Sequence, residues 1–219
     1  MTSNIFHEKL FESKNNTKFG IIITDEDGDT LAEFKHVDFS NNTIKLLTQW
    51  RNEFFDSFFD KFPATEERTK KWLKEQVIEK EDRILFIIWI NGQIYGHMGI
   101  NRYNQEDNSA EIDNVVRGIQ NKHSNLMKNA TIALMTWMYK ELGLSKILVE
   151  CWSDNYPAVN LYLGLIGFKI VEKIPFRKKT TDNGWKWVET TLNENDSGKR
   201  YVVKGEIKPD KFFKLHTKI

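Results

Sequence analysis

Residues 155–168 of the chain are Asn-Tyr-Pro-Ala-Val-Asn-Leu-Tyr-Leu-Gly-Leu-Ile-Gly-Phe, and they set the expected architecture of everything around them. They follow Lys146–Trp152, where a mostly apolar run predicts a largely buried strand. Pro157 is typical of the first turn of a helix. Gly167 is typical of the residue that ends one, because glycine takes a positive φ without strain. With the apolar pattern resuming at Phe168, the stretch predicts strand, short helix and strand in succession.

Working back from this stretch, three further strands and a long helix are expected. Arg83–Ile90 is so uniformly apolar that it predicts a central strand, and Asn91-Gly92 predicts a two-residue turn to an antiparallel strand over Gln93–Ile100. Ser109–Val116 predicts another strand. Apolar residues at three- and four-residue steps then predict a long, mostly buried helix that Ser124 caps.

The amino-terminal part predicts a hairpin and two helices. Residues 1–18 are expected to be a loosely ordered lead to one domain over 19–219, which ends in a hairpin. Phe19–Thr24 and Thr30–Phe34 predict strands around an Asp-Gly turn. Apolar spacing predicts a helix through Trp50, and a capping-box pattern at Thr65 opens a second helix.

Composition excludes several classes of function. The chain has 32 lysines and arginines against 31 aspartates and glutamates, so no overall field draws it to nucleic acid. No stretch approaches the ~20 apolar residues of a membrane span, and the start lacks the apolar core of a signal peptide, so we expect a cytoplasmic protein. The single cysteine, Cys151, excludes an intrachain disulfide, and the five histidines show no metal-ligand spacing, so no metal is expected.

The 155–168 stretch resembles the second half of the acyl-CoA binding core of the GCN5-related N-acetyltransferases. The resemblance rests on Asn155, Ala158, Leu161-Tyr162 and Gly167-Phe168, and it extends over about Val37–Leu192. It implies an α/β (α+β) fold with a mixed central sheet of about six to seven strands, splayed between the fourth and fifth, and about four flanking helices. It also implies acyl-CoA as co-substrate.

In this family the backbone of the fourth strand pairs with the pantetheine arm, and the pyrophosphate binds at the following helix N-terminus, where free amides favour anions. Asn125 and Met127 stand where the family has glycines. Either the pyrophosphate sits further out or coenzyme A binding has degenerated, and we expect the first because the later stretch is intact. The residues implied in binding coenzyme A are Val115, Val116, Arg117, Lys122, His123, Ser124, Asn125, Met127, Lys128, Asn155 and Asn160.

Tyr162 matches the family tyrosine whose hydroxyl protonates the departing thiolate of coenzyme A. The base that takes a proton from the acceptor amine is less determined by the pattern. Asp113 is the first expectation and Glu150, on the neighbouring strand, the second. Glu111, which shares the strand face of Asp113, could also take the proton.

The acceptor is expected from the amino-terminal half. Five phenylalanines between Phe54 and Pro63 either pack under the domain or line a pocket for a flat ligand, and Phe55, Phe58, Phe59 and Trp152 are the expected substrate contacts. This half resembles two branches of the family, one acting on ribosomal protein N-termini and one on nucleotide-linked deoxyamino sugars of bacterial surface polysaccharides.

We therefore expect transfer of an acetyl or short hydroxyacyl group to the amine of a dTDP- or UDP-linked amino sugar, by direct attack in a ternary complex. The alternatives are a protein N-terminal acetyltransferase and a non-catalytic module that binds coenzyme A or a nucleotide. For a bacterial enzyme of this size, a homodimer is the default expectation.

Overall fold

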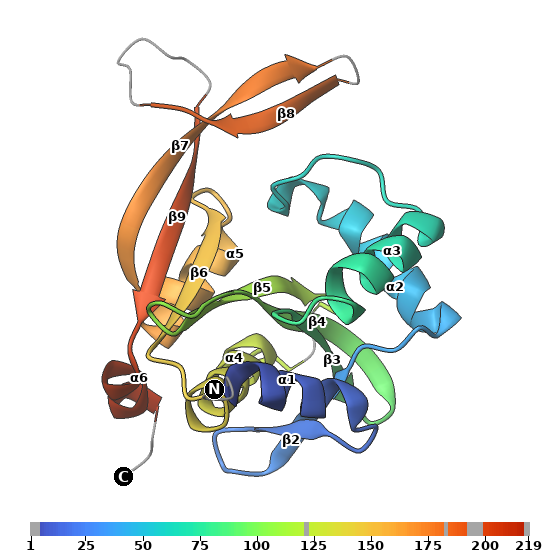
Figure 1. The fold of residues 1–219 in the computed structure, drawn as a ribbon, viewed down its shortest axis with the longest axis vertical. Coiled ribbons are helices and arrows are strands. Elements are labelled where there is room, and N and C mark those ends of the chain that lie inside the picture. The colour runs from blue at the N-terminus through green and yellow to red at the C-terminus, as the bar shows by residue number, and fades with distance from the viewer. Residues whose placement is uncertain (1–4, 121–122, 182–183, 192–198, 217–219) are drawn as a thin grey trace.

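The computed structural model describes residues 5–120, 123–181, 184–191 and 199–216. At its centre lies one mixed sheet of nine strands in the order β1-β2-β3-β4-β5-β6-β9-β7-β8 (Figure 1). All neighbours pair antiparallel except β5 and β6, which are parallel. The strands are β1 Gly20–Thr24, β2 Thr30–His36, β3 Ile84–Ile90, β4 Gln93–Asn104, β5 Ser109–Arg117, β6 Lys146–Trp152, β7 Lys169–Thr181, β8 Gly184–Glu189 and β9 Arg200–Ile207.

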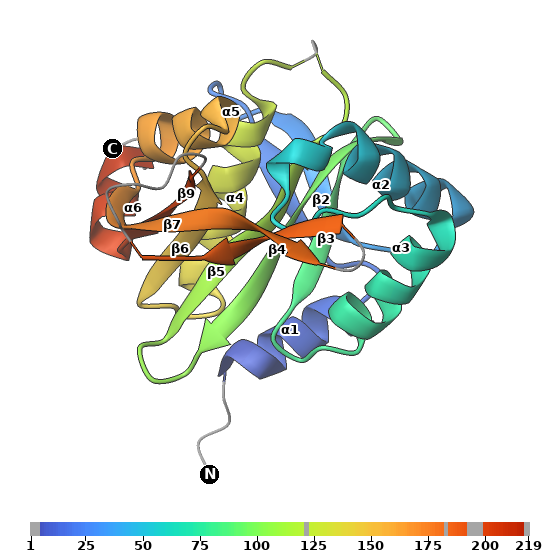
Figure 2. The ribbon, with the colours of Figure 1, turned by 90° about the horizontal axis from the view of Figure 1, so that it is seen from above.

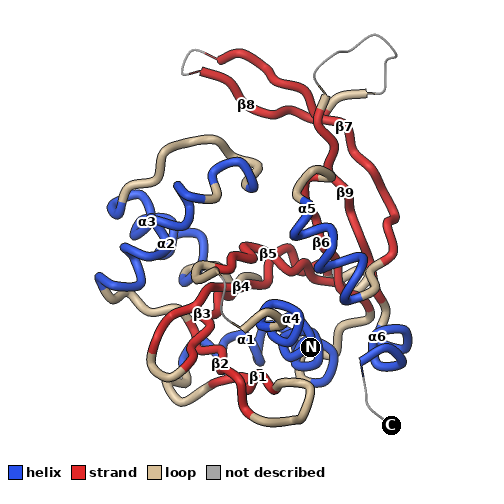
Figure 3. Tube along the Cα trace, turned by 180° about the vertical axis from the view of Figure 1, so that it is seen from behind, coloured by secondary structure: helices blue, strands red, loops and turns tan. Residues whose placement is uncertain are grey.

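Helices cover both faces of this sheet (Figure 3). One hydrophobic cluster joins α1, α4 and α6 to one face, and a second joins α2 and α3 to the other. The α-helices are α1 Ile5–Asn15, α2 Asn41–Glu53, α3 Glu66–Leu73, α4 Leu126–Lys140, α5 Tyr156–Val159 and α6 Pro209–His216. Short 3-10 and π segments are η1 Phe55–Ser57, η2 Lys74–Ile78 and η3 Asn160–Ile166.

Strand β3 shows why a uniformly apolar run belongs in the middle of the sheet. Ile84, Phe86 and Ile88 pack into the cluster of α1 and α4, while Leu85 and Ile87 pack into the cluster of α2 and α3. Successive side chains of a strand point to opposite faces, so a strand covered on both sides needs apolar residues at every position. The expectation of a central strand here is confirmed.

The splay between β5 and β6 is the feature of the sheet that creates space for ligands. The two strands pair only through Ser109–Ile112 and Lys146–Val149, and beyond these residues they diverge. On its other side, β5 carries a bulge, since three steps from Asp113 to Val116 oppose two steps of β4, and Asn114 takes a φ of 50°. This is the expected splayed mixed sheet, but it has more strands than expected, so the splay falls between the fifth and sixth strands instead of the fourth and fifth.

The opening segment differs from its prediction as a loosely ordered lead. Residues 5–15 form helix α1, which buries Phe6 and Leu10, and the Phe6 ring stacks on Tyr103 with centroids 3.9 Å apart. Two apolar residues four positions apart lie on one helix face, but so short a pattern in a polar segment gave little signal. The chain also forms six α-helices within the described residues, against about four expected.

Strands β7 and β8 extend past the rest of the sheet as a two-stranded arm. Seen from above, the arm lies across the sheet (Figure 2). No helix within the described residues has the length and apolar character needed to cross a membrane.

Candidate active site

A cavity of about 820 Å³ lies between helices α2 and α3 and strands β4 and β5. Its sheet side carries polar and charged side chains, and its helix side carries phenylalanines and further charges. The sheet side consists of His97, Asn101, Arg102, Glu111, Asp113 and Asn114. The helix side includes Arg51, Phe58, Phe59, Asp60, Phe62, Arg68, Lys71, Trp72 and Glu75.

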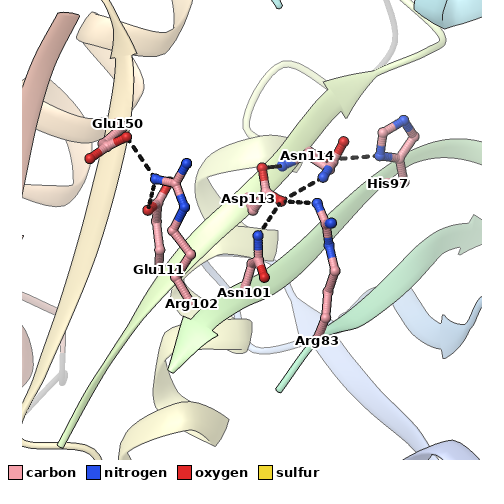
Figure 4. A network of polar contacts seen from close by, with 8 residues as sticks. All are labelled: Arg83, His97, Asn101, Arg102, Glu111, Asp113, Asn114 and Glu150. Carbon is pink, nitrogen blue, oxygen red and sulfur yellow. Dashed lines mark hydrogen bonds and ion pairs between the residues drawn. The ribbon is translucent and has the colours of Figure 1, made fainter. Parts of the chain in front are cut away.

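Glu111 is the carboxylate in this cavity whose ionisation is most altered. It is 7% exposed, and burial, followed by the nearby charge of Glu150, raises the pKa of Glu111 to about 7. Arg102 partly offsets this effect, because its Nη1 lies 2.9 Å from Oε2 of Glu111 and 2.8 Å from Oε2 of Glu150 (Figure 4). A carboxylate with a pKa near neutrality can both accept and release a proton at physiological pH.

Asp113 is more firmly committed to neighbours within the protein. Its Oδ2 accepts from Arg83 Nη2 at 2.5 Å and from Asn114 Nδ2 at 2.6 Å, and its Oδ1 accepts from the Asn114 amide at 2.7 Å (Figure 4). Asn101 adds a longer bond of 3.4 Å. These bonds occupy the carboxylate with donors and tie it to the bulge of β5, so the geometry favours Glu111 over Asp113 as a base.

His97 holds the other side of this bulge. Its Nδ1 lies 2.6 Å from the Asn114 carbonyl oxygen, and burial lowers the pKa of His97 to about 4. The ring is therefore neutral at pH 7, and Nδ1 must donate because a carbonyl only accepts. Strand β4 reaches β5 closely here, since a Cβ on Gly96 would lie 2.3 Å from the Val116 carbonyl oxygen.

Tyr162 lies in η3, beside the splay. It is 4% exposed, its ring contacts Phe168 edge-on, and burial raises its pKa, with smaller contributions from Cys151, Asp113 and Glu111. Among the described residues its hydroxyl has no hydrogen-bond partner. Its oxygen nevertheless keeps some accessible surface. The hydroxyl is thus protonated at neutral pH, and the carboxylates of Asp113 and Glu111 lie near enough to add to the shift of its pKa.

The predicted helix boundaries after β6 are confirmed. Asn155 caps α5, with its Oδ1 accepting from the Ala158 amide at 3.4 Å, and Gly167 ends η3 with a φ of 91°. Asn160 is exposed at the start of η3. This local geometry places Tyr162 on the inner side of the segment.

The amino terminus of α4, expected to hold pyrophosphate, carries an anion of the protein itself. The cap residue is Asn125, one position after the predicted Ser124. Asn125 Nδ2 and Lys128 Nζ both contact Oε1 of Glu26, at 3.1 and 3.2 Å. Met127 packs against the hydrophobic cluster of α1 and α4.

The other residues implied in coenzyme A binding surround this terminus. Val115 packs against the cluster of α1 and α4, whereas Val116 belongs to that of α2 and α3. Arg117 donates to the carbonyl of His123, which has a φ of 54°. Lys122 lies outside the described residues.

Two of the four expected substrate contacts reach the cavity. Phe58 and Phe59 line it, but Phe55 does not, and the ammonium of Lys61 lies 5.0 Å from its ring. Trp152 is fully buried, with its ring 5.0 Å from that of Phe59, so it supports the wall of the cavity instead of contacting a ligand.

Sequence reasoning missed the arginines of the site. Arg51, Arg68, Arg83 and Arg102 come from four different elements and loops, and no spacing along the chain connects them. The sequence offers Glu111 only as a third candidate for the base, after Asp113 and Glu150. A charge facing inward from an otherwise polar helix face looks like ordinary solvent cover until the fold is known.

Comparison with known proteins identifies the fold independently. The family model described as an acetyltransferase (GNAT) domain matches residues 23–169. No curated protein matches the sequence.

Solved structures match at low sequence identity. Spermidine N-acetyltransferase from Vibrio cholerae, solved with CoA and spermine, has a TM-score of 0.64 at 13% identity over 84% of this chain and 98% of that one. A ribosomal L7/L12 α-N-protein acetyltransferase has 0.62 at 15% over 89% and 97%. A GCN5-related N-acetyltransferase from Brucella melitensis has 0.63 at 14% over 91% and 87%. At these identities the likeness is one of fold.

Proposed function

Because the chain belongs to the GNAT family and is an acyl-CoA-dependent N-acetyltransferase, we propose that its acceptor is the amine of a nucleotide-linked deoxyamino sugar. The acyl donor is acetyl-CoA or a slightly larger acyl-CoA. The observation that carries the proposal is the cavity itself, which joins a buried base, Glu111, to a wall of arginines and phenylalanines.

Acyl-CoA would supply the thioester whose acyl carbon the amine attacks, and coenzyme A is the thiol that leaves. The diverging edge of β5 at Val115 and Val116 is free of β6 and suits the pantetheine arm. Glu111 takes a proton from the amine as the N–C bond forms. Tyr162 gives a proton to the sulfur as the C–S bond breaks. Asp113 and Arg83 keep the bulge of β5 in place next to Glu111 along the strand.

The charge of the cavity separates the candidate acceptors. A polyamine would place its distal cations against Arg51 and Arg68 on the helix side, where Lys71 is already paired with Glu75. A nucleotide would place phosphates there and could stack its base on the phenylalanines. This charge pattern favours an acceptor that is anionic away from its amine.

An assay of free-thiol release tests the proposal. Acetyl-CoA and longer acyl-CoAs are each combined with dTDP- and UDP-linked amino sugars, with N-terminal peptides and with spermidine. Release with amino sugar nucleotides alone supports the proposal. Release with peptides but not sugars transfers the function to the protein N-terminal branch, and release with spermidine alone contradicts the charge argument.

A further inference from the structure

Arg51 and Arg68 face the cavity from two different helices and share one aromatic ring. The guanidinium carbon of Arg51, on α2, lies 4.7 Å from the centroid of Phe62 and 3.8 Å from that of Phe58. The guanidinium carbon of Arg68, on α3, lies 5.6 Å from the Phe62 centroid. Stacking on a ring fixes the plane of a guanidinium while leaving its N–H edge available.

Among the cations of the cavity, these two arginines lack a carboxylate partner in the part of the chain that the structure describes. Arg83 pairs with Asp113, Arg102 with Glu111, and Lys71 with Glu75. Within the described residues, neither Arg51 nor Arg68 has a carboxylate within ion-pair distance. Each donates to a backbone carbonyl instead, Arg51 to that of Asp60 at 2.6 Å and Arg68 to that of Pro63 at 3.1 Å.

Arg51 also carries a donor that the protein leaves unused. Its Nη1 is buried and has no hydrogen-bond partner within the described residues. Burial lowers the pKa of Arg51, and the charge of Asp60 offsets this only in part. A buried cationic donor without a partner is costly in the free protein, and an anion bound in the adjoining cavity would offset the charge part of that cost.

The loop that carries Phe62 is held in place before any ligand arrives. The Asn52 side chain exchanges two hydrogen bonds with Ala64, of 3.0 and 2.8 Å, and Lys61 donates to the Phe55 carbonyl at 2.9 Å. The two guanidinium groups are therefore positioned in advance, which lowers the entropy lost on binding.

We propose that Arg51 and Arg68, with Phe62 between them, form the binding site for the diphosphate of the acceptor. Guanidinium groups bind phosphoryl oxygens through paired N–H donors, and two of them match the two phosphates of a nucleoside diphosphate. The assignment to an amino sugar acceptor rests on the proposed function. The binding of the diphosphate itself does not, because it needs neither the amine nor catalysis.

Calorimetric titration with UDP, dTDP and pyrophosphate tests the site. Saturating coenzyme A is present throughout, so that the nucleotides cannot enter its own pyrophosphate site. The variants are Arg51→Gln, Arg68→Gln and Arg51→Lys, and Lys70→Gln is the matched control, because it removes one charge from the exposed side of α3. Thermal melting verifies that each variant is folded.

We expect Arg51→Gln and Arg68→Gln each to weaken UDP and dTDP binding at least 10-fold. Arg51→Lys should weaken it less, and Lys70→Gln should leave it unchanged, as should every variant for coenzyme A. Unaltered nucleotide binding in both glutamine variants, equal loss in Lys70→Gln, or no binding to the wild-type protein would overturn the site. Arginine-dependent binding without turnover of amino sugars would uphold the site and reject the proposed acceptor.

Discussion

Arg102 donates a 2.9 Å hydrogen bond to Glu111, a carboxylate that the fold otherwise covers almost completely. Burial still prevails over this ion pair and holds the Glu111 pKa at about 7. As the proposed base, Glu111 must be ionised to accept a proton, so kcat/KM of the wild-type enzyme should rise with pH and level off above about 7. Glu111→Gln should lower kcat/KM by about 100-fold or more and remove this dependence, as measured by thiol release between pH 5.5 and 9.

Asp113→Asn provides the comparison. This substitution weakens the hydrogen bonds of residue 113 to Arg83 and to the Asn114 amide in the bulge. We therefore expect kcat/KM to fall, while its pH dependence near 7 remains. If Glu111→Gln keeps the dependence and Asp113→Asn or Glu150→Gln abolishes it, the base is one of the latter two residues.

The same pKa shift predicts an effect on stability. The Glu111 pKa is raised from its ordinary value of 4.5 to about 7 on folding, so the native state favours the protonated form. The stabilisation from this preference is complete below about pH 4.5 and is lost as the pH rises through 7. Glu111→Gln, which keeps the neutral form, should therefore melt at a higher temperature than wild type at pH 8. The difference should shrink toward pH 4.5, and a lower melting temperature at pH 8 would contradict the assignment.

Tyr162→Phe removes a hydroxyl that makes no hydrogen bond within the described residues, while keeping the ring that packs on Phe168. Stability and coenzyme A affinity should therefore change little, whereas kcat should fall about 10-fold or more because the thiolate leaves unprotonated. Steady-state kinetics and calorimetry with coenzyme A measure the two quantities separately. Equal loss in affinity and kcat would indicate a binding role instead.

Glu26→Gln tests the anion at the start of α4. The Glu26 carboxylate contacts Asn125 and Lys128, two residues expected to hold the pyrophosphate of coenzyme A. Removing the charge should free Asn125 and Lys128 for the pyrophosphate. Because exposed ion pairs contribute little free energy, the gain in coenzyme A affinity should be modest, about two- to five-fold. The gain should diminish at high salt. Asp27→Asn removes a charge from the same turn, and an equal gain there would reduce the effect to overall charge.

Local patterns were sufficient to predict the framework of this fold. A turn such as Asn91-Gly92 has its own backbone requirement, and both residues take the positive φ values, 49° and 78°, that such a turn needs. The apolar β3 and Gly167 were likewise predictable, because the constraint on each lies within a few residues.

The chemistry of the site depends on residues that are distant in sequence. The raised pKa of Glu111 reflects its burial first and the charge of Glu150 second. Arg51 and Arg68 meet only because α2 and α3 pack together. Trp152 is the last residue of a strand, and the sequence predicts that its ring contacts the substrate. In the structure, the aromatic loop and the β7–β8 arm cover this ring. Neither burial nor charge pairing of this kind is encoded in local spacing.

The short pairing of β5 with β6 also means that this sheet contains an edge in its interior, with backbone groups from Asp113 onward that β6 does not engage. A ligand seated along that edge acts as a removable strand of the sheet. Occupancy and unfolding are then thermodynamically linked, and at a ligand concentration of 100 times Kd the folded state gains about 2.7 kcal/mol. The concentration of acyl-CoA would thereby influence what fraction of the protein is folded at equilibrium.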